Sequence, residues 1–173
     1  MYAYDQCLTC MSYHCDVWLG AANYLITLSK TEGVKDSSLK KIIEGQLAEI
    51  YKKAVNNFMK NNTLIYLAYA NFEEVNFFLF SIFYISNHLI NFTFKNRLNY
   101  QKAYEIYERC IQNGQINEPT LAWIHYIRFA RRREDIVAAR KLFRRAREDP
   151  RSTYHLFIAK AHLEYFCTKV KFV

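Results

Sequence analysis

Aromatic and small residues recur along the chain at the spacing of one helix face. Trp18 is followed by two alanines three and four positions later, and the segments that begin at Tyr66 and Trp123 place aromatic, small or aliphatic residues at the same two positions. A looser copy begins at Phe157. Positions i, i+3 and i+4 share one face of an α-helix, so each segment predicts an amphipathic helix with a buried stripe.

A second pattern alternates with the first. Tyr51, Tyr107 and Phe143 each stand four positions after an apolar residue and three positions before a small one. The last full period, from Trp123 to Phe157, is 34 residues, the length of one helix–turn–helix repeat of the tetratricopeptide class. The sequence therefore predicts an all-α solenoid of about four helical hairpins, a single repeat array over 1–173. We expect the repeat core to contain Trp18, Tyr24, Tyr51, Tyr66, Ala70, Tyr107, Trp123, Tyr126, Phe143 and Ala146.

Two stretches lengthen the earlier periods. Residues 29–38 are polar and predict a surface loop. Residues 75–100 interrupt a repeat, and Val75–Phe94 has no charged side chain. Three explanations stay open for this apolar insert: translated intron, which we favour, a genuine buried or extended helix, and a membrane segment. We do not expect a membrane span, because several asparagines and His88 would lose their hydration in hydrocarbon.

Composition narrows the function classes. Apolar residues make up 51% of the chain and aromatic residues 17%, with only 4 Gly and 2 Pro. This excludes collagen and turn-rich β-folds. With so few glycines, the chain contains neither a glycine-rich phosphate loop nor a nucleophile elbow. We therefore expect no enzymatic activity and no cofactor. Cys7, Cys10 and Cys15 with His14 lack a second ligand pair, and we therefore expect no metal site.

Positive charge is concentrated near the C-terminal end. The net charge is +8, and ten basic against four acidic residues lie between Arg128 and Arg151. Two interpretations stay open: a surface for an anionic partner, and a solvated face whose arginines pair with carboxylates. We expect Glu73 and Glu164 to accept hydrogen bonds or to pair with an arginine of the adjacent helix. The residues of the candidate surface are Arg131, Arg132, Arg133, Arg140, Lys141, Arg144, Arg145 and Arg147.

Some of these segments resemble a known repeat family. Tyr66 followed by Tyr69-Ala70 and Phe72-Glu73, with Ile106–Arg109 in the next helix, resembles the half-a-tetratricopeptide (HAT) repeat. The resemblance is to the suppressor-of-forked family in particular, which supplies the large HAT-repeat subunit of cleavage stimulation factor. The segments that carry this closer resemblance are Phe129–Arg132, Lys141–Asp149 and Leu163–Cys167.

The resemblance implies a nuclear, non-enzymatic scaffold in cleavage and polyadenylation of messenger RNA. It implies a fragment of a longer repeat array, other cleavage and polyadenylation factor subunits as partners, and a homodimer of the full-length protein. Two alternatives stay open: a HAT-repeat scaffold of splicing or ribosomal RNA processing, and direct RNA binding through the basic surface between Arg128 and Arg151.

Overall fold

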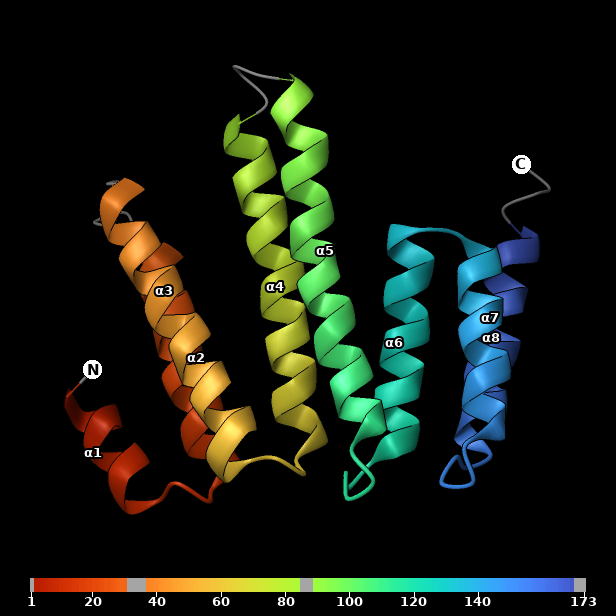
Figure 1. The fold of residues 1–173 in the computed structure, drawn as a ribbon, viewed down its shortest axis with the longest axis horizontal. Helices are drawn as coiled ribbons and strands as arrows, with labels where there is room; N and C mark the ends of the chain where they lie inside the picture. The colour runs from red at the N-terminus through yellow and green to blue at the C-terminus, as the bar shows by residue number, and fades with distance from the viewer. Residues whose placement is uncertain (1, 31–36, 85–88, 170–173) are drawn as a thin grey trace. The chain divides into compact units, whose positions relative to one another are not determined.

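The computed structural model describes the backbone of residues 2–30, 37–84 and 89–169, and the side chains of 2–29, 39, 41–74 and 100–165. Regular secondary structure in these ranges is helical throughout, so the prediction of an all-α helical-repeat fold is confirmed (Figure 1). The helices are α1 (Tyr2–Cys10), α2 (Cys15–Lys30), α3 (Ser37–Lys53), α4 (Thr63–Tyr84), α5 (Leu89–Gln112), α6 (Pro119–Arg133), α7 (Ile136–Glu148) and α8 (His155–Lys169). A π-helical turn, Ala54–Phe58, extends α3.

The chain forms two compact units, residues 1–106 and 107–173. In the first unit, α2 packs against α1, α3 and α4. In the second unit, α6 packs against α7 and α8, which also contact each other. Helices carrying the two sequence patterns alternate in both units, as expected of a helical repeat.

Side-chain caps and prolines mark several helix ends. The amide oxygen of Asn62 accepts a hydrogen bond from the backbone N–H of Ile65 (3.3 Å) at the start of α4. Asp135 caps α7 in the same way through Ala138 (2.7 Å). Pro119 is the first residue of α6, where its missing N–H costs no helical hydrogen bond. These residues therefore fix where the repeat helices begin.

Aromatic rings connect each second-pattern helix to the helix that follows it. Tyr51 stacks on Tyr69, with ring centroids 5.4 Å apart and planes at 12°, and lies 5.5 Å from Phe72. The second unit repeats this geometry: Tyr107 stacks on Tyr126 at 5.0 Å and 4°, and lies 5.3 Å from Phe129. We call each such group of three rings a seam.

Most residues of the expected core are buried, but two are not. The buried ones are Trp18, Tyr51, Tyr66, Ala70, Tyr107, Trp123, Tyr126 and Ala146. Phe143 is only half-buried. The expectation of a buried Tyr24 is wrong, because its side chain is 41% exposed. The helix beside it, α1, has nine residues, and the ring of Tyr24 contacts only that of Tyr4 among the described aromatic pairs (5.5 Å).

The two long stretches fall partly outside the described residues. Of the predicted loop 29–38, residues 31–36 are outside, while 29–30 end α2 and 37–38 begin α3. Within 75–100, α4 continues to Tyr84 and α5 begins at Leu89, with 85–88 outside the description. The three explanations of the insert stay predictions. No helix in the described ranges combines the length and apolar character required to span a bilayer.

Candidate interaction surface

The predicted basic surface occupies the last turn of α6 and the length of α7. Two of its arginines form ion pairs with neighbouring helices. Arg140 on α7 donates from Nε and Nη2 to the two carboxylate oxygens of Glu164 on α8, at 2.9 and 2.7 Å. Lys160 also donates to Glu164. The prediction that Glu164 accepts an arginine of the adjacent helix is confirmed, and these hydrogen bonds lower the pKa of Glu164 to about 2.

Arg145 makes an equivalent connection from α7 to the end of α5. Its two terminal nitrogens donate to Glu108 at 2.6 and 2.5 Å, and Glu108 also accepts from the hydroxyl of Tyr126 at 2.8 Å. The hydrogen bond from Arg145 is the main cause that lowers the pKa of Glu108. The guanidinium carbon of Arg145 lies 5.3 Å from the ring of Trp123. This arginine therefore supports the packing of the second unit.

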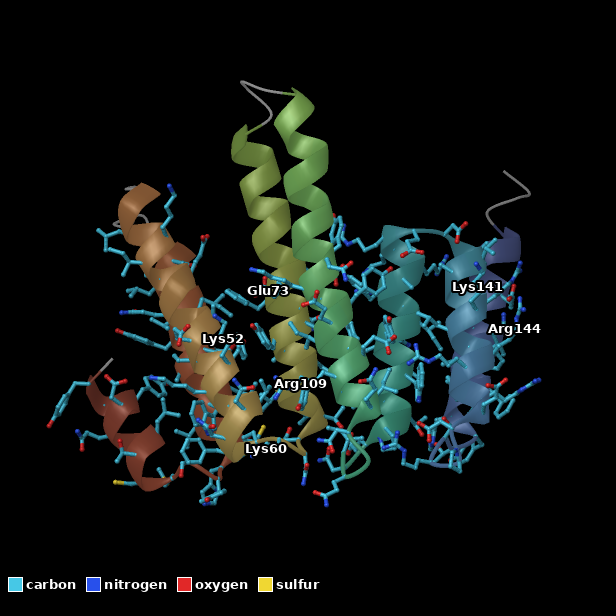
Figure 2. All side chains as sticks on the ribbon, in the orientation of Figure 1. Lys52, Lys60, Glu73, Arg109, Lys141 and Arg144 are labelled. Carbon is cyan, nitrogen blue, oxygen red and sulfur yellow. The ribbon has the colours of Figure 1, made fainter. Side chains whose placement is uncertain are left out.

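Three other cations of the set, all on α7, project into solvent. Lys141, Arg144 and Arg147 are exposed on α7, and Figure 2 shows Lys141 and Arg144 pointing away from the helix pair. Arg131, Arg132 and Arg133 extend the positive charge to the end of α6. Within the predicted surface, Arg140 and Arg145 thus join helices, whereas Lys141, Arg144 and Arg147 are exposed.

A junction of charged residues that sequence reasoning missed holds α5, α6 and the α7–α8 connection together. Asp149, whose side chain is 9% exposed, accepts from the indole N–H of Trp123 at 2.9 Å and from the guanidinium of Arg151 at 2.9 and 3.0 Å. Arg151 also donates to the backbone carbonyls of Asn113 and Ile111, both at 2.9 Å. It satisfies carbonyls that the end of α5 leaves without helical partners.

The hydrogen bonds at this junction lower the pKa of Asp149 to about 2, with Arg151 as the main cause. The same pairing raises the pKa of Arg151. The only signal in the sequence is the short spacing between an acid and an arginine after α7. The distant carbonyl acceptors could not be found from spacing.

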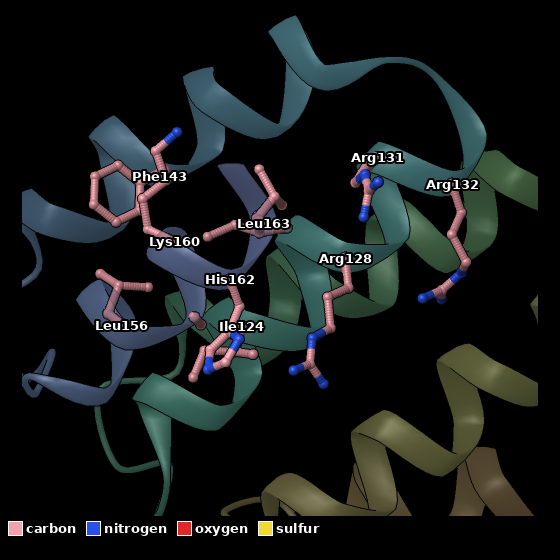
Figure 3. Close-up of a pocket in the computed structure, with 11 residues that line it drawn as sticks. Ile124, Arg128, Arg131, Arg132, Phe143, Leu156, Lys160, His162 and Leu163 are labelled. Carbon is pink, nitrogen blue, oxygen red and sulfur yellow. The ribbon is translucent and has the colours of Figure 1, made fainter. Parts of the chain in front are cut away.

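A groove of about 700 Å³ lies in the second unit between α6 and α8, with one side chain from α7. Its floor is apolar and consists of the buried Ile127, Leu156 and Leu163 with the half-buried Ile124, Phe143 and Ala159. Its rim consists of the exposed Arg128, Arg131, Arg132 and His162 with the half-buried Lys160, as Figure 3 shows. An apolar cleft with a few polar groups around it is the usual form of a binding site.

The groove lies at the corresponding positions of α7 and α8, which we call the third seam, where Lys160 and Leu163 replace the tyrosine and the phenylalanine of the other two seams. Tyr69 on α4 and Tyr126 on α6 stand three positions after the first aromatic of their helices, and Lys160 takes that position on α8. Its ammonium lies 5.5 Å from the ring of Phe143. Phe143 makes an edge contact with Phe157 (5.8 Å, 85°) in place of the stacked pair seen in the other two seams. The flexible lysine thus leaves space above Phe143.

The electrostatic field beside the groove is positive. His125 on α6 is half-buried, and its pKa is lowered by burial first and then by Arg128 and Arg132. None of the described residues that line the groove is acidic. The nearby carboxylate of Glu164 is already bound by Arg140 and Lys160. The rim therefore favours a negatively charged ligand.

The model of the suppressor of forked protein family matches residues 1–173, the whole chain. The chain belongs to this family. It is similar to Protein suppressor of forked of Drosophila melanogaster, with 32% identity over 204 aligned positions that cover 99% of the chain. It is also similar to Cleavage stimulation factor subunit 77 of Arabidopsis thaliana, with 31% identity over 98% of the chain.

A shorter segment of the chain shows higher sequence identity to a third relative. The mRNA 3′-end-processing protein RNA14 of Cryptococcus neoformans is 48% identical over 50 residues, which are 29% of the chain and 5% of that protein. The chain spans 24% of the Drosophila protein and 18% of the Arabidopsis protein. This member of the suppressor of forked family therefore corresponds to a limited part of these relatives.

The reactive side chains of this family member do not converge in the described parts of the chain. No group of three or more His, Cys, Asp or Glu residues there is arranged to hold a metal ion. The thiol of Cys15 donates to the amide oxygen of Asn62 at 3.6 Å, and burial raises its pKa. Cys110 is fully buried, which raises its pKa to about 12. At neutral pH these cysteines are thiols, the form that is a poor nucleophile.

Glu73 is a buried carboxyl of the first unit, and the sequence predicts that it accepts hydrogen bonds. It lies on α4, as Figure 2 shows, and is 7% exposed. Burial raises its pKa, while Lys102 and Lys52 act in the opposite direction. Its place in the repeat matches that of Glu164, seven positions after the first aromatic of the helix.

Proposed function

We propose that this chain is part of a non-enzymatic scaffold that holds other subunits together during 3′-end processing of messenger RNA. The observation that carries the proposal is the family match over residues 1–173, together with relatives whose names refer to cleavage stimulation and mRNA 3′-end processing. Because this processing acts on nuclear transcripts, the proposal includes a nuclear location. Other cleavage and polyadenylation factor subunits are its proposed partners.

The packing of the helices supports a scaffold. Aromatic seams join α3 to α4 and α5 to α6, and ion pairs such as Arg145–Glu108 add connections between helices at the surface. A helical repeat array of this kind offers a long, preformed surface along which several proteins can bind. Such an array orders few residues on binding, so little affinity is lost to conformational entropy.

Affinity purification of the full-length protein tests this function. The tagged protein should co-purify with cleavage and polyadenylation factors from nuclear extract, and its depletion should cause transcripts to extend past their normal 3′ ends. Sequencing of transcript 3′ ends measures the second effect. Co-purification with splicing or ribosomal RNA processing factors, with normal 3′ ends after depletion, would contradict the proposal and favour the alternative scaffold roles.

We propose homodimerisation as a property of the full-length protein, because the resemblance to the large HAT-repeat subunit of cleavage stimulation factor implies it. Light scattering of the full-length protein measures it. A monomer at micromolar concentration would contradict this part of the proposal.

Direct RNA binding is the second candidate function, and one observation favours it. Lys141, Arg144 and Arg147 are exposed on α7, where they could contact phosphates. Binding that depends on phosphate contacts weakens steeply as salt concentration rises. A gel-shift experiment with salt titration on the full-length protein therefore tests it, and salt-insensitive or absent binding would exclude it.

A further inference from the structure

We propose that the groove between α6 and α8 binds an acidic, amphipathic segment of a partner protein. The inference rests on the proposed scaffold function and names the chemistry of one partner. The segment places apolar side chains on the floor formed by Ile127, Leu156 and Leu163, and its carboxylates pair with the arginines of the rim. The shape of the groove, its charge and its place in the repeat support this assignment.

The shape of the groove follows from the incomplete third seam. In the second seam, the ring of Tyr126 covers Tyr107 in a stacked pair at 5.0 Å. In the third seam, Lys160 stands at the equivalent position, and Phe143 remains half-buried. A phenylalanine or leucine side chain of the partner would fill the space that the missing tyrosine leaves. Filling it removes apolar surface from water, which favours association.

The positive charge of the rim favours a partner that carries negative charge. Arg128, Arg131 and Arg132 stand at i, i+3 and i+4 on α6, so they share one face of the helix beside the groove. Guanidinium groups bind carboxylates with two parallel hydrogen bonds, as Arg140 and Arg145 do within this chain. An acidic segment with carboxylates on successive turns matches this row of arginines.

The floor of the groove favours a peptide over RNA. Single-stranded RNA is held by aromatic faces on which the bases stack, together with a continuous cationic track. The floor consists mainly of aliphatic side chains, and the ammonium of Lys160 lies over its aromatic ring, that of Phe143. Aliphatic side chains between cations suit an amphipathic peptide, whose apolar residues alternate with acidic ones.

Fluorescence anisotropy on the full-length protein tests the proposal. The probe is a fluorescein-labelled peptide that repeats Glu-Glu-Phe-Leu. One control peptide carries Lys in place of Glu, and the other carries Ser in place of Phe and Leu. We expect binding of the acidic amphipathic peptide and at least about tenfold weaker binding of either control, because both the charge and the apolar side chains contribute.

Two double variants localise the binding site. Arg128→Glu with Arg131→Glu reverses charge at the rim, and Arg144→Glu with Arg147→Glu makes the same change in net charge on α7, away from the residues that line the groove. All four side chains are exposed, so we expect both variants to fold, as circular dichroism would verify. Binding of the peptide should weaken about tenfold or more in the rim variant and less than about twofold in the α7 variant.

Lys160→Tyr supplies the missing ring and should weaken peptide binding by filling the groove from within. Three results would overturn the proposal: equal losses in the two double variants, unchanged binding in Lys160→Tyr, or a uridine-rich RNA that depends on the rim arginines while the peptide does not bind. If the peptide fails to bind while the full-length protein still co-purifies with 3′-end-processing factors, only this inference fails. If co-purification also fails, the proposed function fails with it.

Discussion

The second unit contains two seams built from the same repeat positions, and they differ most in the two rings that the following helix supplies: Tyr126 and Phe129 on α6 correspond to Lys160 and Leu163 on α8. Tyr107 is buried between Tyr126 and Phe129, with a stacked pair at 5.0 Å. Phe143 meets Lys160 and an edge of Phe157, and it remains half-buried. The first seam, in the first unit, has the same stacked arrangement as the second, through Tyr51 and Tyr69. We call these two seams closed, and the third seam, with its half-buried Phe143, open.

The two kinds of seam therefore have different roles within the same repeat architecture: the closed seams contribute to stability, and the open seam to the proposed binding. A closed seam buries its rings against each other and offers nothing to a partner. The open seam loses that packing but keeps an apolar floor with cations around it. Lys160 and Leu163 in place of a tyrosine and a phenylalanine thus convert packing positions into candidate binding positions, while the helices around them keep their order.

Truncation of the central rings should show the largest difference between the seams. Tyr107→Ala removes a fully buried ring and should lower the free energy of unfolding by about 3–5 kcal/mol. Phe143→Ala removes a half-buried ring and should cost about 1–2 kcal/mol. Urea denaturation followed by circular dichroism measures both, and equal losses would contradict the comparison.

Removal of Arg151 should have the next largest effect, because it joins the closed seam to its surroundings. Arg151→Ala leaves the carboxylate of Asp149 and the carbonyls at the end of α5 without this donor. Hydrogen bonds to charged groups of this kind contribute about 1.5–3 kcal/mol. We expect a loss of that size in the same urea experiment. Arg147→Ala, at an exposed site on α7, is the matched control and should cost less than about 0.5 kcal/mol.

Acid should weaken this junction in a defined pH range. The pKa of Asp149 is about 2 in the folded chain, below its value of about 3.9 in an unfolded chain. A depressed pKa stabilises the fold fully above the unfolded value, and the stabilisation is lost as the pH falls from about 4 toward 2. Asp149→Asn should therefore reduce the slope of stability against pH in this range. An unchanged slope in urea titrations between pH 5 and 2 would contradict the assignment.

Restoring the missing ring should bring the open seam closer to the closed one. Lys160→Tyr adds a stacking partner for Phe143, which contributes about 0.5–1.5 kcal/mol beyond area burial. It also removes the half-buried ion pair with Glu164, worth a few tenths of a kcal/mol. We expect a net gain of about 0.5–1 kcal/mol in the free energy of unfolding. A Lys160→Met variant, which is apolar but not aromatic, separates stacking from burial.

The smallest effect concerns the two bidentate ion pairs. Double-mutant cycles to alanine on Arg145–Glu108, beside the closed seam, and on Arg140–Glu164, beside the open one, should each give a coupling of about 0.2–1 kcal/mol. The first should be the larger, because Glu108 also accepts from Tyr126 and Arg145 lies over Trp123. A larger coupling for Arg140–Glu164 would reverse this ranking.

Sequence reasoning recovered the parts of the fold that depend on neighbours along the chain. The spacing of Trp18, Tyr66 and Trp123 predicted helices because position on a helix face depends only on residue number. The acceptor role of Glu164 also followed from its place in the repeat.

Positions that depend on the next helix were less accessible to the same reasoning. Tyr24 shares the repeat position of Phe72 and Phe129, which are both buried, yet Tyr24 is exposed. The difference comes from the neighbouring helix, because Tyr24 lies beside the short helix α1. The sequence could not divide the basic residues into those that pair, such as Arg145, and those that project, such as Arg144, since their carboxylate partners lie on other helices.

The amino-acid sequence by itself determined the repeat period, the helix faces and the family, because these depend on residue types at fixed spacing. The tertiary structure alone decided which arginines are bound, how Arg151 closes the end of α5, and where an apolar groove opens beside Phe143. Such features require side chains from three helices to meet, and the distances between helices are set by packing.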